Sequence, residues 1–294
     1  MYAGLDCALV VGAMDGRTVL ITGGNTGIGK ETAVALAAAG AVVVFTTRDI
    51  TKGAAALTEI RDRSASTAVD VMELDLARLA SVRELAGRFA DSHDRLDVLV
   101  NNAGLMLGSR RETVDGYEMT FQVNHLGPFL LTTLLREQLV AGSAARVVNV
   151  ASAAHSSARS GLDFDDLQAT RRYRSYTVYA RSKLANILFT RELARRWDDA
   201  GITANAVHPG FVASRFGRDG DTGWFTNLVF PLLRPFALNP EQGAQTQVYV
   251  ASAPELAGIT GGYWAKSAPA TPSAAAQDDA AAAKLWEVSE QLVT

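Results

Sequence analysis

The stretch Thr18–Lys30, TVLITGGNTGIGK, decides the fold. Its first four residues predict a buried strand, and a segment of helical composition begins near its end. Between the two, Gly23, Gly27 and Gly29 follow the spacing G-x-x-x-G-x-G. Glycines let the backbone approach a pyrophosphate closely, and a helix N-terminus offers free N–H groups and the positive end of its dipole. We therefore expect a dinucleotide-binding turn, although a plain strand–helix turn would have a similar composition.

Strand and helix patterns alternate along the rest of the chain. Further strands are expected at Ala41–Thr46, Val69–Leu74, Val98–Asn101, Arg146–Val150 and Thr203–His208, and helices at Gly27–Ala39, Thr51–Arg63, Ala80–Ser92, Val114–Leu139, Tyr176–Asp199 and Ala280–Leu292. This alternation predicts an α/β fold, a doubly wound parallel sheet of Rossmann type. No linker separates two periodic regions, so we expect one domain over 1–294, with an N-terminal extension at 1–15 and a C-terminal helical tail at 267–294.

Composition limits the classes of function. The 294 residues are 48% hydrophobic and 20% charged, with a net charge of −3, which provides no basic surface for nucleic acid. The single cysteine, Cys7, cannot form an internal disulfide and fits a reducing compartment. The apolar run Ala8–Met14 is too short for a secretory signal or a membrane span. We expect a soluble, cytoplasmic protein.

The end of the second expected strand bears on the choice of dinucleotide. It reads Thr46-Thr47-Arg48-Asp49. Folds that select NAD place Asp or Glu here for the ribose 2′-hydroxyl, whereas folds that select NADP use Arg to pair with the 2′-phosphate. Since position 47 is not acidic and Arg48 can pair with a phosphate, NADP(H) is the predicted cofactor and NAD the alternative. The acidic Asp49 directly after Arg48 weighs against the NADP(H) prediction, and Arg48 could instead be a solvated surface charge.

A set of polar residues at the strand ends indicates the chemistry. Tyr179 and Lys183 are four residues apart in an expected helix, so both project from one face. A phenol has a pKa of about 10, and a nearby ammonium together with a positive nicotinamide would favour the phenolate. Ser152 follows the fifth strand, where a hydroxyl could hydrogen-bond a substrate oxygen that gains charge. Asn101-Asn102-Ala103-Gly104 ends the fourth strand, and Asn124 lies in the next helix, so these residues predict interconversion of an alcohol and a carbonyl.

With these motifs in this order, the chain resembles the short-chain dehydrogenase/reductase family. The matching positions are Thr22-Gly23, Gly27, Gly29, Asp75, Asn101-Asn102-Ala103-Gly104, Asn124, Ser152, Tyr179, Lys183 and Pro209-Gly210. The resemblance implies that Tyr179 is the general acid/base and that Lys183 lowers its pKa and holds the nicotinamide ribose. It also implies that Ser152 orients the carbonyl and that Asn124 supports a water-linked proton relay.

The resemblance also implies a cofactor site. Asp75 would contact the adenine edge, Asn102 and Ala103 would wall the adenosine pocket, and Pro209-Gly210 would close over the nicotinamide. The full set of implied cofactor-binding residues is Gly23, Asn25, Thr26, Gly27, Ile28, Gly29, Arg48, Asp75, Leu76, Asn102, Ala103, Gly104, Tyr179, Lys183, Pro209, Gly210 and Val212.

Three further stretches resemble the retinol dehydrogenase-like branch of the family. They are Phe164-Asp165-Asp166-Leu167, the helix YARSKLANILFTRELARR from Tyr179, and Lys284-Leu285-Trp286-Glu287-x-Ser289-Glu290. The chain departs from the pattern in having no N-terminal membrane helix, which argues against membrane retinoid metabolism, and in having Ser at position 214, where Thr is usual. Relatives commonly pair through the helices after the fourth and fifth strands, which implies a homodimer or homotetramer.

The segment 211–240 is expected to form a substrate lid. Its apolar run Trp224–Leu238 follows glycines and is interrupted by Pro231 and Pro235, although a core helix or a membrane-surface contact stays open. Its Phe, Trp and Leu content favours a lipophilic small-molecule aldehyde, ketone or alcohol as substrate.

Other kinds of site fit the sequence less well. His93, His125, His155 and His208 have no metal-binding spacing, so no metal is expected. The residues around Ser152 are not the G-x-S-x-G of a hydrolase. A nucleotide-sugar epimerase or dehydratase would have a different glycine spacing. A non-catalytic protein that senses NADP(H) or binds a partner would be expected to lose the Tyr–Lys pair, which is intact here.

Overall fold

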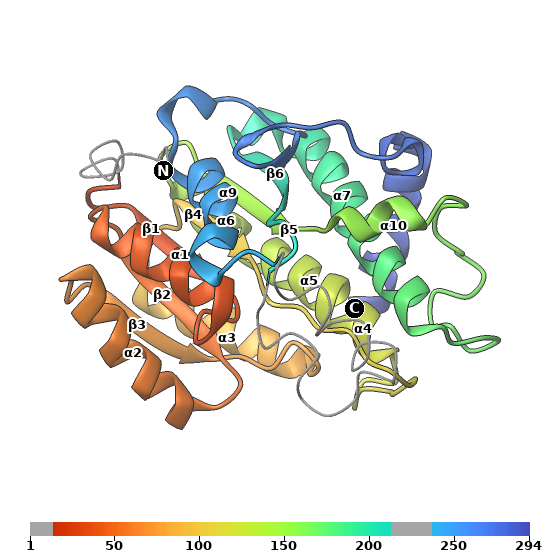
Figure 1. Cartoon of the computed structure of the whole chain (residues 1–294), viewed down its shortest axis with the longest axis horizontal. Helices are drawn as coiled ribbons and strands as arrows, with labels where there is room; N and C mark the ends of the chain where they lie inside the picture. The colour runs from red at the N-terminus through yellow and green to blue at the C-terminus, as the bar shows by residue number, and fades with distance from the viewer. Residues whose placement is uncertain (1–13, 213–236) are drawn as a thin grey trace.

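The computed structural model describes residues 14–212 and 237–294, which form one eight-stranded sheet with helices on both faces (Figure 1). The strands are β1 (Thr18–Ile21), β2 (Val42–Thr47), β3 (Val69–Glu73), β4 (Val98–Asn101), β5 (Arg146–Val150), β6 (Thr203–His208), β7 (Tyr263–Ala265) and β8 (Ala268–Pro269). Their order in the sheet is β3-β2-β1-β4-β5-β6-β7-β8. All pairs are parallel except β7 with β8, so the α/β, Rossmann-type fold predicted from the sequence is confirmed.

The helices form two layers. One face carries α1 (Gly27–Ala38), α2 (Ile50–Ser64) and α9 (Pro240–Ser252), and the other carries α3 (Leu79–Ser92), α5 (Gly127–Leu134), α7 (Ser175–Arg196) and α10 (Asp279–Val293). The short α4 (Met119–Phe121) precedes α5, and α6 (Arg136–Ala141) follows it. Within the described residues, the structure has no helix that is both long and apolar enough to cross a membrane.

Alternate residues of the central strands belong to two different hydrophobic cores. In β1, Val19 and Ile21 belong to the core under α1, α2 and α9, whereas Leu20 belongs to the core under α3, α5 and α7. Because successive side chains of a strand point to opposite faces, a strand covered on both sides must be apolar throughout. This explains the continuous apolar runs that identified the strands.

The region expected as one long helix, Val114–Leu139, is built differently. Val114 is 80% exposed, and helix begins only at Met119, whose N-cap Glu118 accepts hydrogen bonds from the next turn. A π-helical turn, Gln122–Leu126, then separates α4 from α5. Pro128 has no N–H to donate to the carbonyl four residues earlier, so the regular ladder cannot continue through this point. The prediction of an uninterrupted helix was therefore wrong.

Most other boundaries agree with the sequence prediction to within one residue. The helix expected to run to Asp199 ends at Arg196 and is followed by a 3₁₀ turn, Asp198–Ala200. α9, β7 and β8 were not predicted from the sequence. α9 begins with Pro240 after the capping residue Asn239, whose side chain accepts from the N–H of Gln242, a recognisable start signal.

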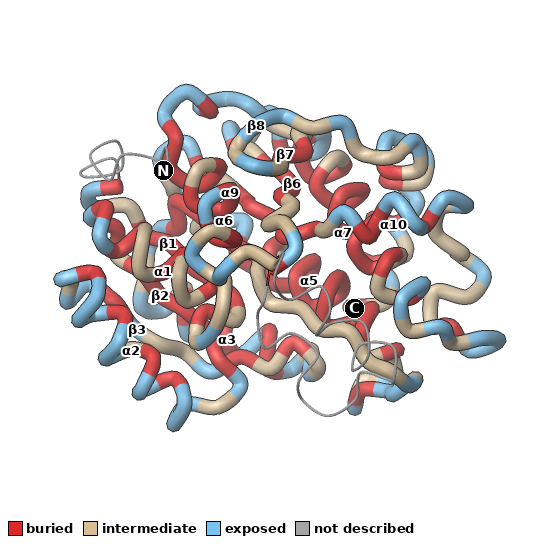
Figure 2. Tube along the Cα trace, viewed as in Figure 1, coloured by how far each residue is buried: buried red, intermediate tan, exposed pale blue. Residues whose placement is uncertain are grey.

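The C-terminal helix α10 packs against α7 and α5. The Trp286 ring lies 5.0 Å from that of Phe129 and 5.9 Å from that of Phe189. Residues 127–132 and 182–190 are buried, so the two helices are enclosed over these lengths (Figure 2). α7, and α5 through Phe129, thus contact a helix of the same chain.

Candidate active site

The expected dinucleotide crevice lies where the strand order reverses, because β1 stands between β2 and β4. The loops that follow β1 and β4 are therefore neighbours at the carboxyl edge of the sheet. A Cβ atom added to Gly23 would lie 3.1 Å from Cβ of Ala103, and one added to Gly29 would lie 2.4 Å from Nδ2 of Asn102. These two glycines are required because the loops pack together without room for a side chain.

Hydrogen bonds fix the contact between the two loops. The hydroxyl of Thr22 accepts from the backbone N–H groups of Asn102 and Ala103, both at 3.0 Å. The Asn102 side chain donates back to the Thr22 carbonyl at 2.8 Å. Asn102 therefore braces the glycine loop, and its implied contact with adenosine stays a prediction.

The start of α1 fits a pyrophosphate. Gly23 and Gly27 have φ of +67° and +57°, in the left-handed region that favours glycine, and the N-cap Thr26 is extended and exposed. The first turn, GIGK, contains no acidic residue that would repel a phosphate. The glycine backbone ahead of a helix N-terminus thus suits a dinucleotide, and the cofactor contacts implied for Asn25 and Ile28 stay predictions.

Two charged residues, Arg48 and Asp49, follow β2 and lie in different surroundings. Thr47 is buried, and Arg48 is exposed beside the glycine loop, whose Gly23 N–H donates to the Thr46 hydroxyl. The Asp49 carboxylate caps α2 by accepting from the N–H groups of Thr51 and Lys52. These bonds to the helix hold the pKa of Asp49 below its usual value. The acid after Arg48 is therefore explained by helix capping and does not require a ribose contact.

The end of β3 presents Asp75 and Leu76. The Asp75 carboxylate accepts from the N–H of Ala77 at 3.0 Å in a local turn, and its own N–H donates to the Ser81 hydroxyl. Leu76 is buried, and a Cβ added to Gly127 of α5 would lie 2.9 Å from its Cδ2 atom. Only the backbone of Leu76 is thus suited to a cofactor contact.

The Tyr–Lys pair lies on α7 as its spacing predicted. The Nζ atom of Lys183 is 5.7 Å from the centre of the Tyr179 ring and donates to the Val150 carbonyl at 2.9 Å. Burial lowers the pKa of Lys183 to about 8. Burial also raises the pKa of Tyr179 to about 12, against a hydrogen bond with the Ser152 side chain that lowers it. With the residues of this chain alone, the Tyr179 pKa therefore moves opposite to the direction expected from the sequence.

Ser152 lies at the end of β5 within hydrogen-bonding reach of Tyr179. Its hydroxyl oxygen also accepts from the N–H of Ala154 at 3.2 Å, because Ser152 caps a 3₁₀ turn, Ala153–Ser157. The cap sets the direction of the hydroxyl. The two oxygens can therefore face one substrate oxygen together.

Asn124 belongs to the π-helical turn and is fully buried. Its amide accepts from the N–H of Leu105 at 2.8 Å and donates to the Leu105 carbonyl and to the Ser182 hydroxyl, both at 2.9 Å. A Cβ added to Gly104 would lie 3.2 Å from Oδ1 of Asn124 and 3.3 Å from Nζ of Lys183. Asn124 and Lys183 therefore both lie close to Gly104. Lys183 is also near Tyr179, which is hydrogen-bonded to Ser152, so the four predicted catalytic residues lie together.

The segment after β6 carries Pro209, Gly210 and Val212. Gly210 has φ of +88°, and a Cβ there would lie 2.6 Å from a methyl carbon of Leu238. Val212 forms a parallel bridge with Leu238, so the two ends of the expected lid are held together. The rest of that lid, including Ser214 and most of Trp224–Leu238, lies outside the described residues.

Two histidines brace the Ser152 turn, which the sequence did not predict. His208 accepts at Nδ1 from the N–H groups of Ala153 and Gly210, at 3.3 and 3.4 Å. His155 accepts at Nε2 from the N–H of Ser273, so its Nδ1 carries the proton and donates to the Ser152 carbonyl at 2.7 Å. Burial lowers the pKa of both histidines, so both are neutral in these roles. Over residues 14–212 and 237–294 no three His, Cys, Asp or Glu side chains converge to hold a metal ion.

Two more supporting residues were missed. Asn186 donates to the Val150 carbonyl at 3.0 Å, the same oxygen that Lys183 binds. It is three residues after Lys183 on α7, so helical spacing could have identified it. The hydroxyl of Ser182 donates to the Tyr179 carbonyl and accepts from Asn124, which joins α7 to the π-helical turn.

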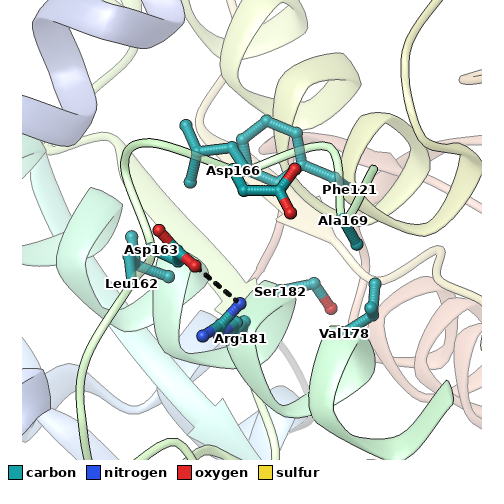
Figure 3. Close-up of a pocket in the computed structure, with 9 residues that line it drawn as sticks. Phe121, Leu162, Asp163, Asp166, Ala169, Val178, Arg181 and Ser182 are labelled. Carbon is teal, nitrogen blue, oxygen red and sulfur yellow. Dashed lines mark ion pairs between the residues drawn. The ribbon is translucent and has the colours of Figure 1, made fainter. Parts of the chain in front are cut away.

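A small cavity lies on the outer side of Ser182 (Figure 3). It encloses about 20 Å³ between α7 and the loop that carries Asp163, whose carboxylate pairs with Arg181 of α7. That volume holds about one water molecule, so the cavity is too small for a substrate. Its lining residues are Phe121, Leu162, Asp163, Asp166, Leu167, Ala169, Val178, Arg181 and Ser182.

Comparison with protein families gives a match over most of the chain. The family described as short chain dehydrogenase matches residues 17–163 and 166–222. Retinol dehydrogenase 13 of Homo sapiens is 42% identical over 283 residues, which cover 95% of this chain and 85% of that protein. Retinol dehydrogenase 12 of Mus musculus is 44% identical over 292 residues, which cover 99% and 90%.

Solved structures agree with this match. An uncharacterized protein from Mycobacterium paratuberculosis has a TM-score of 0.78 and 37% identity, covering 99% of this chain and 98% of that one. RhlG of Pseudomonas aeruginosa, in an active-site complex with NADP, has a TM-score of 0.69 and 28% identity, covering 86% and 96%.

Proposed function

Since the chain belongs to the short-chain dehydrogenase/reductase family and resembles its retinol dehydrogenases, it is an oxidoreductase of CH–OH and C=O groups, and we propose that it uses NADP(H) on a lipophilic substrate. We further propose that Tyr179 is the general acid and base of the reaction, and one observation carries this assignment. Ser152 and Tyr179 share a hydrogen bond at the carboxyl edge of the sheet, with the Lys183 ammonium 5.7 Å from the phenol ring.

In reduction, Tyr179 donates its phenolic proton to the substrate oxygen as negative charge develops there. Ser152 donates a hydrogen bond to the same oxygen, and this bond strengthens as the charge grows. In oxidation the Tyr179 oxygen takes the proton back from the alcohol. The nicotinamide, when bound, supplies or accepts the hydride.

The Tyr179 phenolate is costly in this site, because burial raises the pKa of the phenol to about 12. The positive charge of Lys183 opposes that cost, since a nearby cation favours an anionic phenolate. Lys183 is held by the Val150 carbonyl and is close to Gly104, where it can also bind a ribose hydroxyl. Asn124 is assigned to a proton relay because its amide converges with the Lys183 ammonium on that glycine.

We propose that the dinucleotide lies along the glycine loop, with its pyrophosphate at the N-terminus of α1. Gly23, Gly27 and Gly29 provide the close approach, and Arg48 binds the 2′-phosphate that distinguishes NADP from NAD. The capping role of Asp49 supports this assignment, because its charge is directed at α2.

The lipophilic substrate is inferred from the apolar composition of 211–240, which we propose as the lid of the site. The relatives named retinol dehydrogenases support an apolar substrate of this class. Phe211, at the start of the segment, is 40% exposed next to the Pro209–Gly210 turn and can contact such a substrate.

A substrate panel tests the proposal. NADPH oxidation should be measured by absorbance with a homologous series of linear aldehydes and with polycyclic ketones. We expect kcat/KM to rise with chain length, since each buried CH₂ contributes about 0.8 kcal/mol. A flat or inverted trend would contradict the lipophilic site, and NADPH binding without turnover of any carbonyl would favour a non-catalytic role.

A further inference from the structure

The π-helical turn Gln122–Leu126 is hydrogen-bonded to its surroundings on two sides. Pro128 interrupts the regular α-helical hydrogen bonding here, and two side chains of the turn connect it to its surroundings. On one side the Asn124 amide binds Leu105 and Ser182. On the other side His125 reaches α10, where its Nε2 atom lies 2.8 Å from the hydroxyl of Ser289, 164 residues away in sequence.

The direction of this second contact can be assigned. The Ser289 hydroxyl donates to the Leu285 carbonyl at 2.7 Å, so its oxygen accepts from His125, whose Nε2 must carry the proton. Burial lowers the pKa of His125 to about 3, so the ring stays neutral at ordinary pH. Its Nδ1 atom has no hydrogen-bond partner among the described residues, which leaves the bond to Ser289 as the polar anchor of the ring.

Aromatic packing holds both partners in place. The His125 ring lies 5.3 Å from that of Phe121 and 5.9 Å from that of Phe189, and Trp286 packs on Phe129 and Phe189 from α10. Both His125 and Ser289 are at most 1% exposed. A bond between two such enclosed groups transmits the position of α10 directly to the π-helical turn.

We propose that α10 is a positioning element of the active site, which holds Asn124 in place through the hydrogen bond from His125 to Ser289. Asn124 in turn holds the backbone of Leu105 next to Gly104 and Lys183. The catalytic consequence rests on the function proposed above. His125 and Ser289 touch no reacting atom, so they are positioning residues.

Four variants test this inference. Ser289→Ala removes the acceptor, and His125→Phe removes the donor while keeping an aromatic ring in the cluster, which protects folding. The double variant combines them. Leu285→Val is the matched control, because it loosens the packing of α10 at a buried position without removing the hydrogen bond.

We expect both single variants to lower kcat by about tenfold or more, because a small misplacement of site groups is costly, with KM and NADPH affinity nearly unchanged. The double variant should lose no more than either single variant, because both remove the same contact. Hydrogen exchange at the Leu105 amide, which donates to Asn124, should quicken in all three. Leu285→Val should lower the melting temperature without either effect.

Wild-type kcat and Leu105 exchange in both single variants would overturn the inference, and so would losses that multiply in the double variant. If the wild-type protein turned over no carbonyl, the proposed function would fail on its own. Exchange at Leu105 would then still decide whether α10 positions Asn124.

Discussion

The ammonium nitrogen of Lys183 lies 5.7 Å from the centre of the Tyr179 ring. Lys183 is only 3% exposed, and the hydrogen bond from its ammonium to the Val150 carbonyl holds the nitrogen at that distance. A buried cation this close to a phenol acts on the phenolate far more strongly than it would in water. The two residues therefore have to be considered as one unit in any test of the site.

Removing the phenolic hydroxyl tests the central role. Tyr179→Phe should leave folding and NADPH binding intact, while turnover falls by about 10²–10⁴, the usual contribution of a positioned acid or base. Steady-state kinetics on the best aldehyde would measure this. Tyr249→Phe on α9 makes the same chemical change at another tyrosine and should keep wild-type turnover. Near wild-type activity in Tyr179→Phe would show that the mechanism is wrong.

The buried ammonium predicts a pH dependence of stability. The pKa of Lys183 falls from 10.5 in the unfolded chain to about 8 in the folded protein, so between these values only the unfolded chain binds the proton. This group therefore makes the folded state more stable as the pH rises through that window, by at most about 1.4 kcal/mol per pH unit. Urea unfolding at pH 7.5 and 9.5 should show wild type gaining stability relative to Lys183→Met. Parallel pH dependences of the two proteins would contradict the prediction.

Cofactor selectivity should depend on Arg48. NADPH should bind at least about tenfold more tightly than NADH, or about 1.4 kcal/mol, and Arg48→Ala should remove most of that difference. Fluorescence titration of both dinucleotides measures it. Lys52→Ala, which removes a nearby cation paired with Asp49 on α2, should keep the preference. Equal affinities in the wild-type protein would exclude the assignment of Arg48.

The packing of the glycine loop predicts a steric effect on cofactor binding. An added Cβ at Gly29 would lie 2.4 Å from the Asn102 amide and 2.6 Å from the Gly23 carbonyl, so Gly29→Ala must displace one of the loops. We expect NADPH affinity to fall by about tenfold or more, or about 1.4 kcal/mol. Gly87→Ala in α3, where nothing lies within 4 Å of the new methyl, should keep the affinity and stabilise the protein slightly. Unchanged affinity in Gly29→Ala would mean that the cofactor lies elsewhere.

The packing of α10 bears on the expected homodimer or homotetramer. Because this helix packs along α7 and its Trp286 contacts Phe129 of α5, pairing through the face of α7 that it covers would require α10 to leave its place. We therefore expect a monomer of 31.2 kDa by light scattering at micromolar concentration. A stable dimer in which α7 gains protection from hydrogen exchange would contradict this expectation.

Local patterns account for what the sequence could predict. The strands were recognisable because residues such as Val19 and Leu20 must both be apolar when helices cover the two faces of a sheet. The Tyr179–Lys183 pair was recognisable because a helix places residues four apart on one face. Each of these two signals is carried by residues that are only a few positions apart along the chain.

What the sequence could not predict depends on contacts between distant segments. The π-helical turn follows from Pro128 locally, but its anchoring to Ser289 joins segments 164 residues apart. The bracing of Ser152 by His155 and His208 likewise comes from the tertiary fold. The direction of the Tyr179 pKa shift depends on burial, which no spacing of residues in the sequence reveals.

The attachment of α10 also has a consequence for the order of folding. The glycine loop and its neighbour after β4 come from the first 104 residues, and α9, whose Gln247 donates to Asn102, completes their surroundings by Ser252. The turn that carries Asn124 has to wait for a helix at residues 279–293, and closing so long a loop is slow. During synthesis the phosphate cradle can therefore be complete once α9 has formed, before α10 completes the hydride-transfer site, so the emerging chain should be able to hold a nucleotide before it can react with one.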